Sequence, residues 1–361
     1  MEEYRQIINR ICENIHNEIV DFEEDREKIR KPTMVSSEFI TNKQQGDWAE
    51  DVLFRAINDH SSDVIAVRYG KSDNLVAGDE GFEAFFSKYQ EELDTIGKRP
   101  DLLLFKAEDY DSALGTDISN KDYHEIDAYV RKAIAGIEVR SSAFFFDGYM
   151  QDANRKVEEN RRRAMAVKEK ILNEYRDLLE TKSPKILSQI EGCPIESLDY
   201  RVPGYKASQH LKELNALLSE LMGCVRALRD RNSLSFTPKD EDLKVVYKWI
   251  MTYNVPHYYV QVFFDRMFGV SFCHILELIA NSDLKGEKYF IEKDPKNQNK
   301  TTIKIPVQDG VCLVAEPMIE PRHYSMRKEL GKGRLLFYVG FDGGEARIDK
   351  EAFDRLFGCN L

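Results

Sequence analysis

Two short apolar segments of this 361-residue chain each carry a carboxylate, and a carboxylate is costly inside a β-sheet. The run Leu102–Phe105 directly follows Pro100-Asp101, and Glu138 stands inside the run Ile137-Glu138-Val139. A continuous apolar run bounded by proline and charge predicts a buried strand. A carboxylate buried there needs an ion partner, a proton or a bound cation. Any fold of this chain must therefore compensate these two acids.

Two such carboxylates on neighbouring strands would form an oxygen-rich site of the kind that Mg2+ prefers. Arg140 follows Glu138 by two residues. Side chains on a strand repeat every second residue, so the pattern predicts that Glu138 and Arg140 point to the same side. Each acid also has an ordinary explanation: aspartate after proline often begins a strand or turn, and a lone glutamate in a strand often faces solvent.

The remaining hydrophobic pattern predicts an α/β protein with a helical insertion. Helices are expected at 4–30, at about 45–59, within 151–230, and from Thr237-Pro238 onward, with a further helix after the strand at 256–265. Strands are expected at 63–69, 102–105, 133–140, 256–265, 301–307, 310–315 and 334–341, with a polar, glycine-containing loop after Tyr69. The predicted domains are an N-terminal helix at 1–35, core halves at 36–150 and 231–282, a helical insertion at 151–230, and a β-rich C-terminal region at 283–361, for DNA recognition or dimerisation.

The formal net charge of −11 argues against a protein that coats nucleic acid through a broad basic surface. It leaves room for an enzyme that grips DNA in one cleft and uses divalent cations. Between Arg155 and Lys170 the local balance reverses, with seven basic against three acidic residues. This segment is either a solvated helix face or an arm that faces phosphates. A leucine stripe from Leu211 to Leu228 is either an ordinary core face or a dimer seam.

Several classes of protein are disfavoured by the sequence. The longest apolar runs fall far short of the roughly 20 residues of a membrane span, and the charged N-terminus does not resemble a secretory signal. The six cysteines are scattered, which is typical of buried thiols in a reducing compartment and gives no zinc-site spacing. We therefore expect a cytoplasmic protein without structural zinc.

Pro100-Asp101 together with Glu138-Val139-Arg140 resembles the PD-(D/E)XK nuclease motif, in which the last position is usually lysine. Glu138 follows Asp101 by 37 positions. Residues 41–50, 138–142 and 236–265 resemble type II restriction endonucleases of the AccI-like family, and the resemblance extends over roughly residues 35–280.

This resemblance implies a homodimer that cuts both strands of duplex DNA at a short palindromic site with Mg2+. It implies a restriction-endonuclease-like core, with a mixed central sheet flanked by helices, in the cytoplasm of a bacterium or archaeon. A cognate DNA methyltransferase would belong to the same system without being a physical partner. Carried over by position, Asp101 and Glu138 would be the metal ligands, and Glu50 the carboxylate on a preceding helix.

Arginine in place of the motif lysine changes the expected chemistry. A guanidinium stabilises negative charge but keeps its proton, so Arg140 cannot act as a general base. Either the metal alone activates the water or another lysine has taken that role, and Lys239 is one candidate. Residues expected to contact DNA are more numerous: Arg155, Lys156, Arg161, Arg162, Arg163, Lys239 and His257.

Two other interpretations stay open at this stage. A structure-specific or repair DNA nuclease could share the same fold, and a defined cleavage pattern on plasmid DNA would separate it from a restriction enzyme. A non-enzymatic helical interaction protein could use the acidic surface and the leucine stripe to bind partners. Such a protein would have no use for Glu138 in a strand, and Glu138→Gln would then affect only stability.

Overall fold

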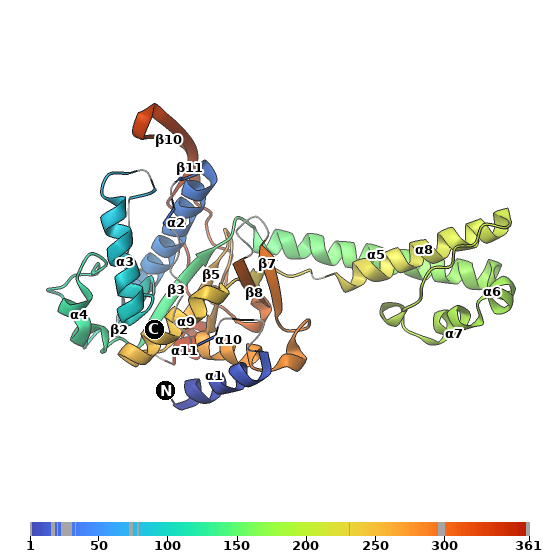
Figure 1. The fold of residues 1–361 in the computed structure, drawn as a ribbon, viewed down its shortest axis with the longest axis horizontal. Coiled ribbons are helices and arrows are strands. Elements are labelled where there is room, and N and C mark those ends of the chain that lie inside the picture. Colours follow the sequence, from blue (N-terminus) through green and yellow to red (C-terminus); the bar gives the residue numbers. More distant parts are fainter. Residues whose placement is uncertain are drawn as a thin grey trace. The chain divides into compact units, whose positions relative to one another are not determined.

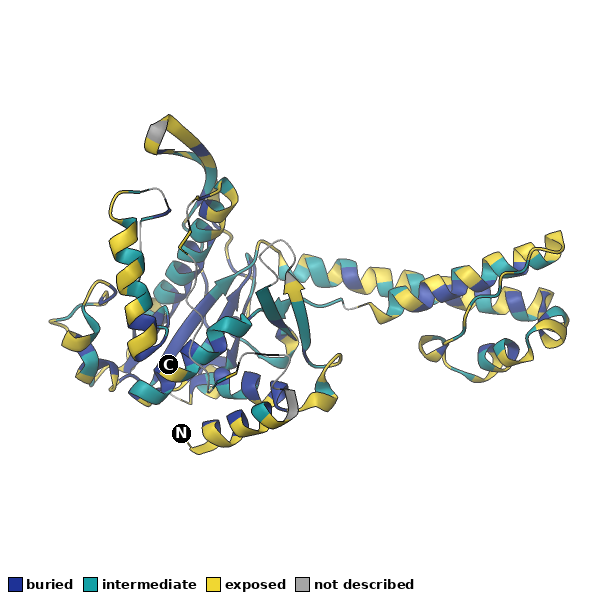
Figure 2. Ribbon diagram, viewed as in Figure 1, coloured by how far each residue is buried: buried dark blue, intermediate teal, exposed yellow. Residues whose placement is uncertain are grey.

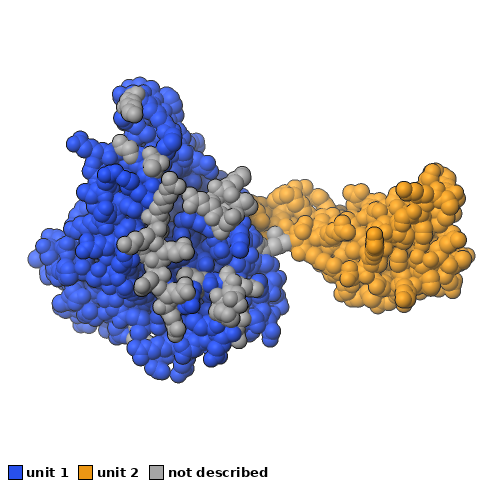
Figure 3. Space-filling view, in the orientation of Figure 1, with its two compact units in different colours: residues 1–146, 234–361 blue, residues 147–233 orange. Residues whose placement is uncertain are grey.

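The computed structural model describes residues 2–15, 19, 21–22, 31–32, 34–71, 75–77, 79–230, 232–294 and 300–358. The chain forms two compact units, coloured separately in Figure 3. The core unit comprises Met1–Phe146 and Leu234–Leu361, and the helical unit comprises Asp147–Ser233. The predicted helical insertion at 151–230 lies inside the helical unit.

A six-stranded sheet with the order β1-β2-β3-β5-β6-β9 forms the centre of the core unit (Figure 1). β3 and β5 run parallel, and the other neighbouring strands are antiparallel. The strands are β1 (Val64–Arg68), β2 (Leu102–Lys106), β3 (Ala135–Ser141), β5 (His257–Val262), β6 (Met267–Ser271) and β9 (Val311–Cys312). This mixed sheet flanked by helices confirms the predicted fold class. β6 is the one strand of this sheet that was not predicted.

Alternate residues of each strand pack on opposite faces of the sheet, so a fully apolar run such as β2 is buried on both sides (Figure 2). Leu102 and Leu104 pack with residues of α2 and α11, whereas Leu103 and Phe105 pack with residues of α1, α4, α9 and α10. These helices are α1 (Glu2–Ile15), α2 (Ser37–His60), α4 (Tyr123–Val130), α9 (Asp240–Tyr253), α10 (Phe272–Ile279) and α11 (Lys350–Phe357).

Three predicted helix boundaries differ from the structure. α1 ends at Ile15, residues 19, 21 and 22 are not helical, and the rest of the stretch predicted as helix to residue 30 lies outside the described residues. α2 begins eight residues earlier than predicted because the Ser36 side chain accepts a hydrogen bond from the Phe39 amide and caps the helix. α9 begins at Asp240, since Pro238 and Lys239 are held extended against β8 (Lys300–Pro306).

α3 (Phe82–Ile96) lies in a stretch for which a polar loop was predicted. Gly81 and Gly97 border it, and both have a φ of +84°, a conformation that glycine adopts without strain. The Gly97 amide closes the helix by donating to the Leu93 carbonyl. Glycines at both ends suggested a loop, although the aromatic residues between them have helical spacing.

The C-terminal third is β-rich, as predicted. β10 (Arg322–Leu330) and β11 (Arg334–Asp342) form a hairpin that packs against α2, and β4 (Ser235–Phe236), β8 and β7 (Phe290–Asp294) form a three-stranded sheet. The hairpin contributes Leu330 and Leu336 to a small apolar cluster with Ile40 of α2.

The helical unit has its own hydrophobic core. Its helices are α5 (Phe146–Glu174), α6 (Arg176–Lys182), α7 (Pro184–Gly192) and α8 (Gln209–Arg229). Leu214, Leu218 and Leu221 of the predicted leucine stripe are fully buried against α5 residues such as Ile171. The stripe is therefore a core face of this unit, and the alternative of a dimer seam is wrong for these residues.

The described cysteines, Cys12, Cys193, Cys224, Cys273 and Cys312, are all free thiols. Within the described part of the chain, every helix is too short or too polar to cross a bilayer.

Candidate active site

The two predicted carboxylates lie side by side, Asp101 just before β2 and Glu138 in the middle of β3. Leu102 pairs with Ile137 across these antiparallel strands, so the preceding Asp101 lies beside Glu138. The Val139 amide donates a hydrogen bond of 2.7 Å to Asp101 Oδ2, which fixes the aspartate against β3. A Cβ on Gly70 would come within 2.9 Å of Asp101 Cα, so only glycine leaves room for this arrangement.

Glu138 is the buried acid of the site, with 2% of its surface exposed. Its Oε1 accepts a 2.6 Å hydrogen bond from Lys98 Nζ and lies 2.9 Å from Arg140 Nη2. The prediction that Glu138 and Arg140 share one side of the strand is therefore confirmed. Glu138 Oε2 has no hydrogen-bond partner in the described structure.

A third acid, Asp242 in the first turn of α9, completes the cluster around Glu138. Its Oδ2 accepts from Lys98 Nζ at 3.1 Å and from Arg140 Nη2 at 2.8 Å. Two cations and two carboxylates thus alternate in one group around the buried Glu138. We did not predict Lys98 or Asp242. Lys98 stands only three residues before Asp101, whereas an acid in the first helical turn usually indicates nothing beyond the helix dipole.

Mutual attraction keeps these four groups charged despite burial. Burial alone would lower the pKa of Lys98, but Asp242 and Glu138 outweigh it and raise that pKa. The same two acids overcome burial to raise the pKa of Arg140. Burial alone would raise the pKa of Glu138 and of Asp242, but Lys98 and Arg140 lower both. Both cations therefore carry fixed positive charge at neutral pH.

Asp101 and Glu50 experience the opposite environment. Burial, followed by the negative charges of Glu138 and Glu50, raises the pKa of Asp101 well above its usual range. Burial together with Asp47 and Glu138 raises the pKa of Glu50, on α2, to about 7. Lys98 and Arg140 pair with Glu138 and Asp242, so negative charge is in excess around Asp101 and Glu50. A divalent cation would relieve that excess.

One cavity of about 570 Å3 brings these groups together. Glu50 on α2, Asp101 before β2, and Glu138 and Arg140 on β3 all line it, together with Lys98. The structure thus places all four residues predicted as catalytic, Asp101, Glu138, Arg140 and Glu50, at a single cavity. Its walls also include one side of α3.

Comparison with known protein families assigns the chain to one of them. The family model described as AccI restriction endonuclease matches residues 1–360. The chain belongs to the AccI restriction endonuclease family. This membership covers the tails beyond the predicted 35–280, and it supports a nuclease over a non-enzymatic interaction protein. No curated protein and no solved structure matches the chain.

Five of the seven residues predicted to contact DNA lie on α5, in the helical unit. Four of them are engaged by nearby carboxylates: Arg155 and Lys156 pair with Asp152, Arg161 with Glu158 and Glu196, and Arg163 with Glu220. Arg162 donates to the Glu158 carbonyl. These pairs neutralise much of the local positive charge.

The other two residues predicted to contact DNA belong to the core unit. Lys239 is half-buried, and this burial lowers its pKa. Asp242 acts to raise that pKa, whereas Arg140 and Lys98 lower it further. His257 has no exposed surface, so the prediction that it contacts DNA is wrong. It opens β5 between the rings of Trp249 and Phe272, a position set by packing that the strand pattern does not encode.

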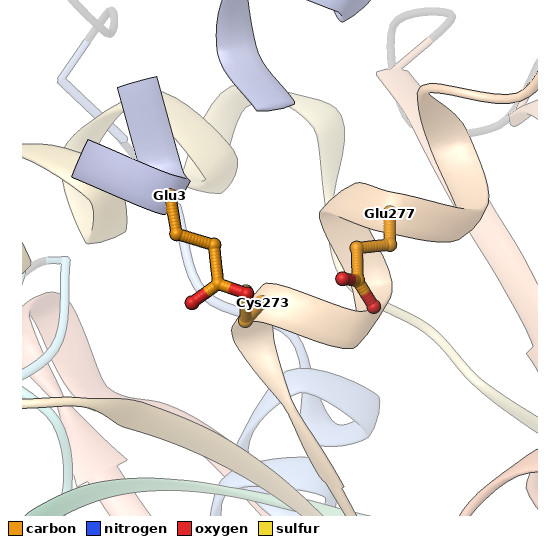
Figure 4. Close-up of side chains that lie close together, drawn as sticks. All are labelled: Glu3, Cys273 and Glu277. Atoms are coloured by element: carbon orange, nitrogen blue, oxygen red, sulfur yellow. The ribbon is translucent and has the colours of Figure 1, made fainter. Parts of the chain in front are cut away.

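A second group of potential metal ligands lies far along the chain from these acids. Glu3 of α1 and Cys273 and Glu277 of α10 place their ligand atoms within 4.8 Å of one another (Figure 4). Burial, with Glu3 and Glu277 adding to it, raises the pKa of the Cys273 thiol to about 11. The thiol therefore keeps its proton at neutral pH, and both carboxylates are exposed. This group does not match the requirements of a nuclease centre.

The pH dependence of stability should identify His257 as a buried neutral imidazole. Burial lowers its pKa from 6.5 to about 4. Below pH 6.5 the unfolded chain binds a proton that the folded chain does not bind until about pH 4. The unfolding free energy should therefore fall by up to about 3 kcal/mol over this interval because of His257.

Urea denaturation of wild type and His257→Phe between pH 7.5 and 4.5 measures this contribution. The variant should lose part of the acid destabilisation, whereas His124→Phe, at an exposed position, should retain it. A His257→Phe variant with the wild-type pH dependence would contradict the assignment.

Proposed function

We propose that this chain is a type II site-specific deoxyribonuclease that hydrolyses both strands of duplex DNA at a short palindromic site. The observation that carries this proposal is the paired arrangement of Asp101, just before β2, and Glu138, on the neighbouring strand β3, with fixed cations beside Glu138. Membership in the AccI restriction endonuclease family supports the reaction class. The preference for a palindrome and for two-strand cleavage comes from the resemblance.

We propose Mg2+ as the cofactor, held by Asp101 and Glu138 with Glu50 nearby. The chemistry of the donors supports this choice, because all three offer hard carboxylate oxygens. Glu138 Oε2 is a buried acceptor without a partner, and Asp101 and Glu50 are acids whose pKa values are raised. When bound there, Mg2+ would polarise the scissile phosphate and lower the pKa of a coordinated water.

The chain's own residues supply positive charge at fixed positions. Lys98 and Arg140 are each bound to both Glu138 and Asp242, so neither cation has to reorganise when charge develops on the phosphate. Both hold their protons firmly and therefore serve as electrostatic stabilisers rather than general bases. In the PD-(D/E)XK motif a lysine usually stands where this chain has Arg140. We propose that Lys98, rather than Lys239, provides the positive charge of that lysine.

Cleavage should require both a divalent metal and the two carboxylates. Incubation with long unmethylated DNA and Mg2+ should yield discrete fragments, a chelator should abolish them, and Ca2+ should permit binding with little cutting. Asp101→Asn and Glu138→Gln should each reduce cleavage below detection on an agarose gel. The matched control Asp63→Asn changes an exposed acid next to β1 and should cut normally.

Each alternative outcome has a definite meaning. Nicking or smearing that depends on the structure of the DNA would favour a repair or structure-specific nuclease. Normal cutting by either carboxylate variant would show that the reaction uses other residues.

The contribution of Arg140 should appear in the rate rather than in affinity. Arg140→Ala should lower the single-turnover cleavage rate by about 10²–10³-fold, the usual cost of removing one preorganised donor. Affinity for uncut DNA in Ca2+ should change much less, because the interaction strengthens mainly in the transition state.

Two further variants complete the cation series. Arg140→Lys should retain partial activity, since a cation remains although its planar geometry is lost. Lys88→Met, which removes an exposed lysine paired with Asp122, is the control. Wild-type rates for Arg140→Ala would transfer the role to another cation, and Lys98→Met and Lys239→Met would identify it.

A palindromic target also predicts a protein with two-fold symmetry, with one active site for each strand. Analytical ultracentrifugation should therefore find a dimer, either free or bound to a duplex that contains the cleavage site. A strict monomer in both samples would disprove the homodimer while leaving the nuclease activity standing.

A further inference from the structure

The wall that α3 contributes to the active-site cavity is aromatic. Phe82, Phe85, Phe86 and Tyr89 have the spacing i, i+3, i+4 and i+7, which places them along one side of a helix. All four are half-buried and all four line the cavity that contains Asp101 and Glu138. α3 therefore presents a row of rings to the site of phosphodiester chemistry.

These four rings are separate from the hydrophobic core. None of them belongs to the apolar clusters that the described residues form, whereas Ile96 at the other end of α3 does. They pack on one another instead: Phe82 on Phe86, with ring centroids 5.9 Å apart, and Phe85 on Tyr89, at 6.2 Å and nearly parallel. Four adjacent rings outside the core are costly on a water-lined surface unless a ligand covers them.

Buried ion pairs hold this aromatic wall in place relative to the catalytic acids. Glu92, one helical turn after Tyr89, accepts from Arg99 Nε at 2.5 Å and from Lys71 Nζ at 2.6 Å. Arg99 stands two residues before Asp101, and both Glu92 and Arg99 are about 95% buried. These ion pairs therefore tie the last part of α3 to the segment that leads into Asp101.

The cavity combines two kinds of surface. Its lining includes buried charged residues such as Glu138, and exposed residues that are either apolar, such as Phe39, which is 56% exposed, or polar, such as Asn42. Pro32, Leu75 and Val76 add further apolar surface to the lining. A matching ligand has both a charged group and a flat apolar group, as a nucleotide does.

We propose that the α3 wall receives a nucleobase of the substrate DNA, unstacked from the duplex next to the phosphate that is cleaved. This inference rests on the proposed nuclease function and adds the form in which the DNA is bound. A volume of about 570 Å3 lies in the range of small-molecule sites, so it accommodates one nucleotide rather than stacked base pairs. Every base has a π-face, so stacking on Phe85 and Phe86 needs no particular base.

Duplexes with one base removed test this proposal. After the cleavage site has been mapped by sequencing the fragment ends, two modified duplexes are compared with the intact one. In the first, the partner of a nucleotide flanking the scissile phosphate is abasic, which frees that nucleotide from pairing and lowers the cost of unstacking it. In the second, an abasic position lies outside the mapped site. Binding is measured in Ca2+ and single-turnover cleavage in Mg2+.

Phe85→Ala and Phe86→Ala should each weaken binding of the intact duplex by about 5- to 150-fold, the range for loss of one stacked base. The abasic partner next to the scissile phosphate should restore most of the lost affinity and rate in these variants, and the distant abasic position should not. Phe144→Ala removes a 46% exposed ring that does not line the cavity and should behave as wild type.

Leucine variants test whether the effect of the alanine variants comes from misfolding. Phe85→Leu and Phe86→Leu keep apolar bulk without a π-face, so they should retain the wild-type urea midpoint and still show the loss and its rescue. Wild-type affinity in both alanine variants, or a loss that the adjacent abasic partner does not rescue, would overturn the proposal. A wild-type protein that cuts no DNA would instead refute the nuclease function.

Discussion

The negative charge of Glu138, nearly excluded from water inside the central sheet, is the constraint on which the rest of the site depends. An isolated buried carboxylate costs several kcal/mol and would take up a proton. Here Lys98 and Arg140 both reach Glu138 Oε1, and Asp242 binds the same two cations. The group therefore joins β3, the segment before β2 and the first turn of α9 through ion pairs. If one of these segments moved, the charged side chains on the other two would lose their ion partners.

This network divides the acids of the cavity into two sets with different properties. Glu138 and Asp242 are compensated by protein cations, and their pKa values are lowered. Asp101 and Glu50 lack such compensation, and their pKa values are raised. Positive charge is consequently fixed at Glu138 Oε1, while Glu138 Oε2, Asp101 and Glu50 offer acceptors for a hard cation. A phosphodiester between these groups would meet both kinds of stabilisation without movement of the protein.

The distribution of charge over the two units bears on how DNA is attracted. The core unit has 36 Lys and Arg against 49 Asp and Glu, whereas the helical unit has 16 against 14. Long-range attraction by the core unit as a whole is therefore unfavourable. Under the proposed function, affinity for DNA would come from short-range groups, from the proposed divalent cation and, under the proposed stacking, from aromatic contacts that carry no charge. Such contacts are less sensitive to salt than phosphate contacts are.

By itself the sequence determined the strand that follows Asp101 and the strand that carries Glu138, the common side of Glu138 and Arg140, and the helical character of residues 151–230. These features follow from local periodicity and from the cost of burying charge, which a short window of sequence expresses. Only the tertiary structure brought in Lys98 and Asp242, because the hydrogen-bond partners in that group lie 40, 102 and 144 residues apart in the chain. Likewise, the helical spacing of Phe82, Phe85 and Phe86 is local, but their position on the cavity wall depends on where Arg99 and Lys71 hold Glu92. Periodicity encodes which residues are buried, whereas the topology of the sheet decides which buried charges meet.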